Sequence, residues 1–145
     1  MRLAVVTVAA VLATAATAHA KADAPTLTLA HGGQTARAEI GSFCATGLCV
    51  DRIHPDRPAE KLDVSGGELV TLRFGLRARH ASVHLLRIRA DGTGKVGRRV
   101  TALRITRKRW RVRLPQHLRR ANALDVFARG RDWDASFWGG LHRTG

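Results

Sequence analysis

The clearest hydropathy pattern in the chain runs from residue 107 to residue 114, where Trp110, Val112 and Leu114 alternate with basic residues. Successive side chains of a β-strand point to opposite faces of its sheet, so this period of two predicts a strand with one buried and one charged face. Pro115 has no amide hydrogen to give to a ladder, and it ends the segment. The charged face is expected to carry a row of arginines, namely Arg107, Arg109, Arg111 and Arg113.

Similar segments, each bounded by residues typical of turns, recur along most of the chain. The expected strands are residues 26–30, 35–43, 60–64, 68–76, 82–90, 100–105, 108–114, 124–128 and 135–141. Glycine-bearing turns at residues 65–67 and 91–94 are expected to form hairpins. Residues 129–132 are expected to join the last two strands, and residues 116–121 to form one helical turn. About eight short strands between such turns predict an all-β, antiparallel, immunoglobulin-like β-sandwich.

The alternation also predicts which side chains fill the core. A shift of register by one residue would bury the arginines beside Trp110 and expose its indole, so only one register avoids burying unpaired charge. The expected core residues are Leu72, Phe74, Leu86, Ile88, Trp110, Val112, Leu124, Val126 and Phe137.

The N-terminus has the pattern of a secretory signal peptide. Arg2 precedes an uncharged, mainly apolar run over residues 3–18, and Ala18-His19-Ala20 offers a small-x-small cleavage site. We expect a signal peptide over residues 1–20 with cleavage after Ala20, a secreted or extracytoplasmic protein, and one β-sandwich domain over residues 21–145. An uncleaved anchor is the alternative, and no later stretch is apolar enough to be expected to cross a bilayer.

Both cysteines, Cys44 and Cys49, lie in one short segment where an extended stretch meets a turn. Two cysteines in an exported chain usually pair, so a structural disulfide that closes a small loop is the favoured interpretation. A redox pair is one alternative, and half of a zinc or copper site completed by His54 is another. The spacing lacks the paired C-x-x-C and H-x-x-x-H elements of structural zinc sites, so we expect no metal and no other cofactor.

The residue patterns of common enzyme sites are not found in the sequence. No serine lies in a G-x-S-x-G turn, and residues 92–95 are too short for a phosphate-binding loop. His80 and His84 lie four apart in a strand-like segment, which would place them more than about 10 Å apart. The acids that could form a carboxylate pair lie in expected turns and are Asp51, Asp56, Asp132 and Asp134. We therefore expect that the protein is not an enzyme, with a small secreted hydrolase as an alternative.

The aromatic residues near the C-terminus divide between two faces. On an alternating strand Trp133 and Phe137 share a face, which favours packing inward, and Trp138 points the other way. Trp138 is therefore the expected solvent-facing aromatic residue, suited to stacking on a sugar or a lipid.

The chain is strongly basic, with 25 lysines and arginines against 11 acids and a net charge of +14. Such a surface attracts anionic polymers of the cell envelope, acidic lipid surfaces and, without specificity, nucleic acid. Arg87 and Arg89 alternate with Leu86 and Ile88, and they join the arginines of residues 107–113 as candidate anion-binding residues. The alternative is an inert structural component of the envelope whose arginines only keep its surface solvated.

Several phrases of the sequence together resemble those of one family. They are Gly41-Ser42-Phe43-Cys44, Cys49 with Asp51, the Gly-Glu-Leu-Val-Thr-Leu of residues 67–72, Leu114-Pro115, and Leu124-Asp125-Val126 before a closing strand. Over most of the expected mature chain, these phrases resemble small secreted bacterial immunoglobulin-like proteins of unassigned function. The resemblance implies a fold and a location and no catalytic residues. Combined with the charge, it favours a non-catalytic binding module for anionic envelope polymers or surfaces.

Overall fold

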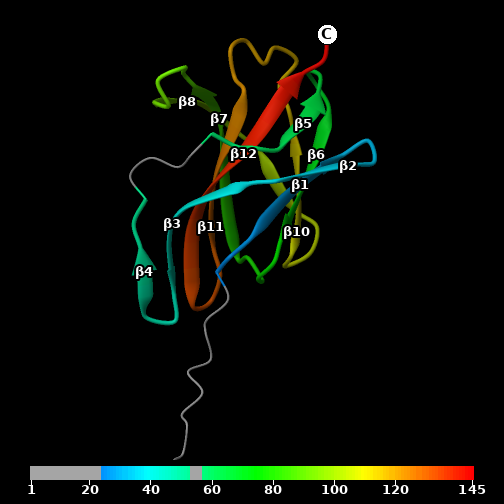
Figure 1. Cartoon of the computed structure of the whole chain (residues 1–145). Helices are drawn as coiled ribbons and strands as arrows, with labels where there is room; N and C mark the ends of the chain where they lie inside the picture. The colour runs from blue at the N-terminus through cyan, green and yellow to red at the C-terminus, as the bar shows by residue number, and fades with distance from the viewer. Residues whose placement is uncertain (1–23, 53–56) are drawn as a thin grey trace, which may run out of the picture.

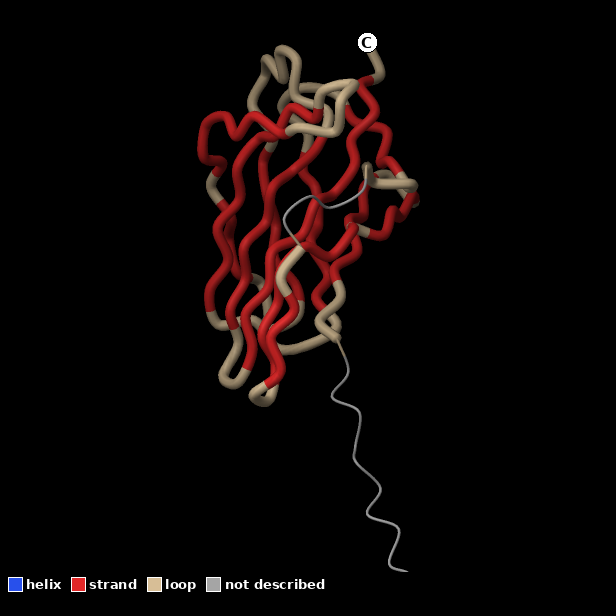
Figure 2. The backbone as a smooth tube through the Cα atoms, turned by 60° about the vertical axis from the view of Figure 1, so that its left-hand side comes forward, coloured by secondary structure: helices blue, strands red, loops and turns tan. Residues whose placement is uncertain are grey.

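The computed structural model describes residues 24–52 and 57–145, and the regular elements in these two ranges are all β-strands. Most of the strands run along the long axis of the molecule, with loops at both ends (Figures 1 and 2). They are β1 (Leu27–His31), β2 (Gln34–Arg37), β3 (Glu39–Ala45), β4 (Leu48–Val50), β5 (Lys61–Val64), β6 (Leu69–Phe74), β7 (His80–Ile88), β8 (Gly94–Val100), β9 (Ala102–Arg104), β10 (Arg109–Arg113), β11 (Ala123–Arg129) and β12 (Trp133–Arg143). The expected signal peptide, residues 1–20, lies outside the described residues.

The strands form two sheets. The first sheet has the order β2-β1-β6-β10-β9, and the second has the order β4-β3-β12-β11-β7-β8. β5 lies beside the C-terminal half of β12 in the second sheet and pairs with it in parallel, whereas the other pairings are antiparallel. The prediction of an all-β protein built from antiparallel sheets is confirmed. Within the described ranges, no helix has the length and apolar character of a membrane span.

The core lies between the two sheets. Trp110 and Leu72 from the first sheet pack in one cluster with Val126 and Phe137 from the second. The nine expected core residues are all buried, with exposed fractions from 0% to 8%. Strict alternation with charged or polar residues therefore identified buried positions correctly, because burying unpaired arginines would cost far more than exposing a few apolar atoms.

Leu86 and Ile88 are buried, but the expectation that they face the main core is wrong. On β7, Val83 and Leu85 point between the sheets. Leu86 and Ile88 belong to a separate cluster on the outer face of the second sheet, where Trp138 packs against them. β7 is apolar on both faces at this end, so alternation alone does not specify which face is inside.

The expected hairpin around residues 65–67 is also wrong, because β5 and β6 belong to different sheets. A Cβ atom at Gly66 would lie 1.9 Å from the carbonyl oxygen of Gln116. The next amide, Gly67 N, donates to Pro115 O at 3.2 Å. The glycine pair thus lets the chain cross from one sheet to the other in close contact with the backbone after β10.

Other segments divide differently from the prediction. The residues expected as one strand over 35–43 form β2 and β3, and β4 and most of β8 were not expected. Residues 116–121 contain a turn closed by Ala121 N and Leu118 O at 2.9 Å, with no helical turn. A hairpin does form at residues 91–94, but its second strand is β8 rather than the expected strand over residues 100–105. The expected pairing of β11 with β12 is confirmed.

Candidate functional site

β10 carries most of the expected arginine row. Arg109, Arg111 and Arg113 are exposed on the outer face of the first sheet, while Trp110 and Val112 between them are buried. Arg107 precedes β10 in the bend that follows β9, so it is not part of the strand. The regular row is therefore three residues long.

Two neighbouring strands add arginines to the same face. The register places Arg73 on β6 directly opposite Arg109, and Thr28 on β1 lies between Arg73 and Arg37 on β2. Sequence analysis missed Arg37 and Arg73 because their place beside β10 depends on strand order. We call Arg37, Arg73, Arg109, Arg111 and Arg113 the arginine face.

The charge of the arginine face is not neutralised by acids. The five strands of the first sheet contain no Asp and no Glu. At its edges, Glu60 accepts a hydrogen bond from the backbone N of Arg37 at 2.6 Å, and Glu68 pairs with His31 at 3.0 Å. The ion pairs among the described residues both involve histidine, so no guanidinium there has a carboxylate partner within 4.0 Å.

Apolar and hydroxyl side chains separate these arginines. Leu69, Leu103 and Ile105 are 38%, 63% and 43% exposed. Thr71 lies opposite Arg111, and Leu103 lies opposite it on the other side. The face is thus an open sheet surface of cations and uncharged side chains.

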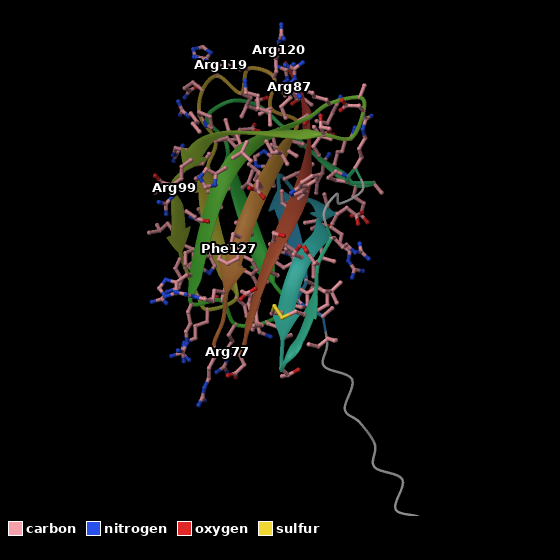
Figure 3. All side chains as sticks on the ribbon, turned by 90° about the vertical axis from the view of Figure 1, so that its left-hand side faces the viewer. Arg77, Arg87, Arg99, Arg119, Arg120 and Phe127 are labelled. Carbon is pink, nitrogen blue, oxygen red and sulfur yellow. A yellow bond between two sulfur atoms is a disulfide. The ribbon has the colours of Figure 1, made fainter. Side chains whose placement is uncertain are left out.

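Arg87 and Arg89 lie far from this face, on and just after β7 of the second sheet. Arg87 lines a groove with Arg119 and Arg120, and Figure 3 shows these three at the same end of the molecule. The backbone carbonyl of Arg89 accepts a hydrogen bond from the guanidinium of Arg57 at 2.7 Å. The six arginines expected as one anion-binding set are therefore divided between two surfaces.

The cysteines form the expected disulfide. Cys44 on β3 and Cys49 on β4 lie directly opposite each other in an antiparallel pair. The turn between the strands has positive φ at Thr46 and Gly47, which suits a two-residue hairpin. A disulfide leaves no thiolate to bind a metal, and the other proposed ligand, His54, lies outside the described residues.

Other candidate catalytic or metal-binding groups do not come together. Residues 24–52 and 57–145 contain no group of three or more His, Cys, Asp or Glu side chains arranged to hold a metal ion. Ser42 donates to Asp51 at 2.6 Å and accepts from Arg52 N at 3.1 Å, so this pair caps the end of β4. Asp56 lies outside the described residues.

A row of polar side chains crosses the outer face of the second sheet. Its members, one from each of five neighbouring strands, are Glu39, Trp138, Asp125, His84 and Arg99. Burial raises the pKa of the Asp125 carboxyl above its ordinary value, while His84 and a hydrogen bond with Trp138 oppose the rise. The row therefore contains acidic and basic side chains, and Trp138, Asp125 and His84 within it are partly buried.

Trp138, the expected solvent-facing aromatic, is half-buried in this row. Its indole packs against the cluster of Leu86, Ile88 and Ala123. The more exposed aromatic is Phe127, 47% exposed on the same face and labelled in Figure 3. Its ring lies between Ser82 and Ser136 on the neighbouring strands.

No protein-family model matches this chain, and neither a curated protein nor a solved structure matches it.

Proposed function

We propose that the protein is a secreted, non-catalytic binding module of immunoglobulin-like type that holds anionic polymers of the cell envelope on its arginine face. The observation that carries the proposal is that the arginine face draws exposed arginines from three strands of the first sheet, while none of its five strands contains an acid. A sheet surface used only for solubility normally intersperses both signs of charge. This surface carries one sign, so its favourable partners are anions.

The spacing of the arginines suits a repeating anion. Residues two apart on one strand are separated by about 7 Å, and adjacent strands lie about 5 Å apart. Arg109, Arg111 and Arg113 therefore form one line of charges, with Arg73 beside its first member. A flexible polyanion laid along β10 would meet several guanidinium groups at once and release its counterions, which favours binding at low salt.

The affinity for a defined polyanion tests this proposal. Titrating the protein with polyphosphate and with heparin at rising NaCl measures how steeply log K falls with log salt concentration. The test variant combines Arg73→Thr, Arg109→Thr and Arg111→Thr, because these three side chains donate no hydrogen bond within the described residues. We expect the slope to become shallower by about 2 to 3.

A matched control has the same net charge as the test variant, because it also loses three arginines. Arg52→Thr, Arg129→Thr and Arg131→Thr remove three exposed charges away from the first sheet. The control is expected to retain most of the affinity. Equal losses in the two variants would mean that only net charge matters, and absence of binding even at low salt would favour an inert envelope component. Binding to anionic vesicles but to neither polymer would identify an acidic lipid surface as the partner.

A further inference from the structure

A groove opens between the β7–β8 hairpin and the segment over residues 115–121. Its volume is about 710 Å³, within the range of small-molecule sites. β7 contributes Leu85 and Arg87, β8 contributes residues 95–98, and the remaining lining comes from residues 115–121. These elements come from two distant parts of the chain, so the groove is a product of tertiary structure.

The lining of the groove is cationic. Its basic residues are Arg87, Lys95, Arg98, His117, Arg119 and Arg120. None of the lining residues, all of which belong to the described ranges, is an acid. An oxyanion in the groove would thus meet guanidinium groups from both walls, and guanidinium groups form strong charge-assisted hydrogen bonds with phosphate and carboxylate oxygens.

Apart from Gln116, the rest of the lining is apolar. Leu85 and Leu118 are 7% and 5% exposed, and Val96 at the rim is 55% exposed. The lining includes no Phe, Tyr or Trp on which a sugar ring would stack. An aliphatic chain matches such a surface better than a carbohydrate or a base does.

The wall formed by residues 115–121 is held in place from several directions. Pro115 O accepts from Gly67 N at 3.2 Å, and Asn122 N donates to Leu86 O at 3.0 Å. The side-chain amide of Asn122 also bonds the backbone N and O of Ile88 at 2.8 and 2.9 Å. Both ends of the segment are therefore tied to the strands before a ligand arrives, which lowers the entropic cost of binding.

Arg119 is held in an uncommon backbone conformation within this wall. Its φ is +50°, in the left-handed region that favours glycine, and its carbonyl accepts a hydrogen bond from the guanidinium of Arg143. A non-glycine residue persists there only when its surroundings enforce the conformation, and such residues cluster at ligand sites. A glycine would fit this backbone conformation at lower cost, so Arg119 can be replaced by glycine without added strain.

We propose that this groove binds an amphiphile with an oxyanion headgroup. Arg87, Arg119 and Arg120 hold the headgroup, and the aliphatic chain lies against Val96, the most exposed aliphatic residue of the lining. The groove shares no residue with the arginine face, and its ligand goes beyond the proposed function. An experiment can therefore contradict one of the two proposals without contradicting the other.

Monomeric decyl phosphate, kept below its micelle concentration, is a direct probe. Isothermal titration of the whole chain compares it with inorganic phosphate, which lacks the chain, and with decyl maltoside, which lacks the charge. We expect decyl phosphate to bind at least about tenfold more tightly than either. Equal affinity for inorganic phosphate would overturn the amphiphile and leave a simple anion site. Equal affinity for decyl maltoside would overturn the role of the arginines.

Variants locate the binding. Arg119→Gly suits the local φ, so combining it with Arg120→Ser removes two guanidinium groups without added backbone strain. We expect decyl phosphate to bind about tenfold or more weakly to this variant. The control, Arg129→Ser with Arg131→Ser, removes the same charge elsewhere and is expected to bind as the parent does.

A second variant changes the rim of the groove without removing an arginine. Val96→Asp places a carboxylate at the exposed rim, where it should repel the headgroup and leave the core intact. Val96→Thr is its neutral partner and is expected to bind nearly as the parent does. The triple arginine-face variant should bind decyl phosphate normally. Unchanged binding in both the Arg119→Gly, Arg120→Ser variant and the Val96→Asp variant would place the amphiphile elsewhere and overturn the assignment.

Discussion

Arg73 on β6 and Arg109 on β10 lie directly opposite each other on the outer face of the first sheet. Phe74 N donates to Lys108 O at 2.8 Å, so the adjacent Arg73–Arg109 pair falls at a non-hydrogen-bonded position of the ladder. Side chains approach each other most closely at such positions. Like charges placed opposite each other destabilise a sheet, and a bound anion would relieve that repulsion.

Removing one member of this pair is expected to stabilise the protein. Arg73→Thr places a residue that favours strands beside Arg109 and should raise the free energy of unfolding by about 0.2 to 1 kcal/mol at low salt. The gain should shrink in concentrated NaCl, because salt screens the repulsion in the parent protein. Urea unfolding at two salt concentrations measures both effects.

Arg111→Thr is the control for this experiment. Arg111 lies opposite Thr71 on β6 and has no opposing charge there, so its replacement should change stability less than that of Arg73. If Arg73→Thr lowered stability at low salt, the two guanidinium groups would not be repelling each other in the folded state.

Loss of the disulfide is expected to have a modest and local effect. Replacing Cys44 and Cys49 together by Ser should lower the free energy of unfolding by about 2 kcal/mol, because the loop that the bond closes is short. In the described part of the chain β4 pairs only with β3, and Leu48 on it is 58% exposed, so few contacts hold this edge strand. Hydrogen exchange should therefore rise in residues 48–50 and remain slow in β11 and β12. Loss of protection throughout the sandwich would show that the bond supports the whole domain.

The partly buried carboxyl of Asp125 is expected to make stability depend on pH. Burial raises its pKa in the folded protein above the ordinary value of 3.8, so the folded state holds the proton more tightly than the unfolded chain does. Its stabilising contribution is therefore complete below the unfolded pKa and is lost as pH rises through the folded pKa. Asp125→Asn keeps an acceptor for Trp138 and removes the ionisation.

We expect the Asp125→Asn protein to be more stable than the parent at pH 8, with the difference narrowing towards pH 3. Urea unfolding of both proteins across this range measures the effect, and contributions from other carboxyl groups largely cancel in the difference. Repeating the comparison in a His84→Gln background removes the charge that opposes the rise in pKa. A stability difference that did not vary with pH would mean that Asp125 titrates alike in the folded and unfolded states.

Sequence analysis located buried positions best where charge and apolar character alternate strictly. Around Trp110 the flanking arginines allow one register only, and the structure agrees. Leu86 and Ile88 were assigned to the wrong face because Val83 and Leu85 on the same strand are equally apolar. Hydropathy cannot choose between two apolar faces, since the choice depends on which partner covers each of them.

The candidate sites depend even more on tertiary structure. Arg73 joins Arg109 only because β6 and β10 are neighbours, although 36 positions separate them along the chain. The groove arises because residues 115–121 lie against the β7–β8 hairpin. This wall contains the turn closed by Leu118 and Ala121, in which Arg119 adopts a left-handed backbone conformation. No residue pattern in the sequence predicts that conformation.

Trp110 is the most sensitive test of the core. It is 7% exposed and lies opposite Leu72 on β6, in the cluster shared by the two sheets. Trp110→Ala is therefore expected to lower the free energy of unfolding by about 3 to 5 kcal/mol, since it removes a large buried side chain and leaves a cavity. Arg111→Ala, at the next position on the exposed face, should change it by no more than about 0.5 kcal/mol.

A third substitution separates the ring from its polar atom. The indole Nε1 of Trp110 is buried and has no hydrogen-bond partner among residues 24–52 and 57–145, which costs free energy in the folded state. Trp110→Phe removes that unpaired donor while keeping an aromatic ring, so it should cost well under half as much as Trp110→Ala. Urea unfolding of the three variants gives the comparison. If Trp110→Ala and Arg111→Ala prove equally mild, β10 is not buried on one face; if Trp110→Phe costs as much as Trp110→Ala, the indole N–H is satisfied in solution.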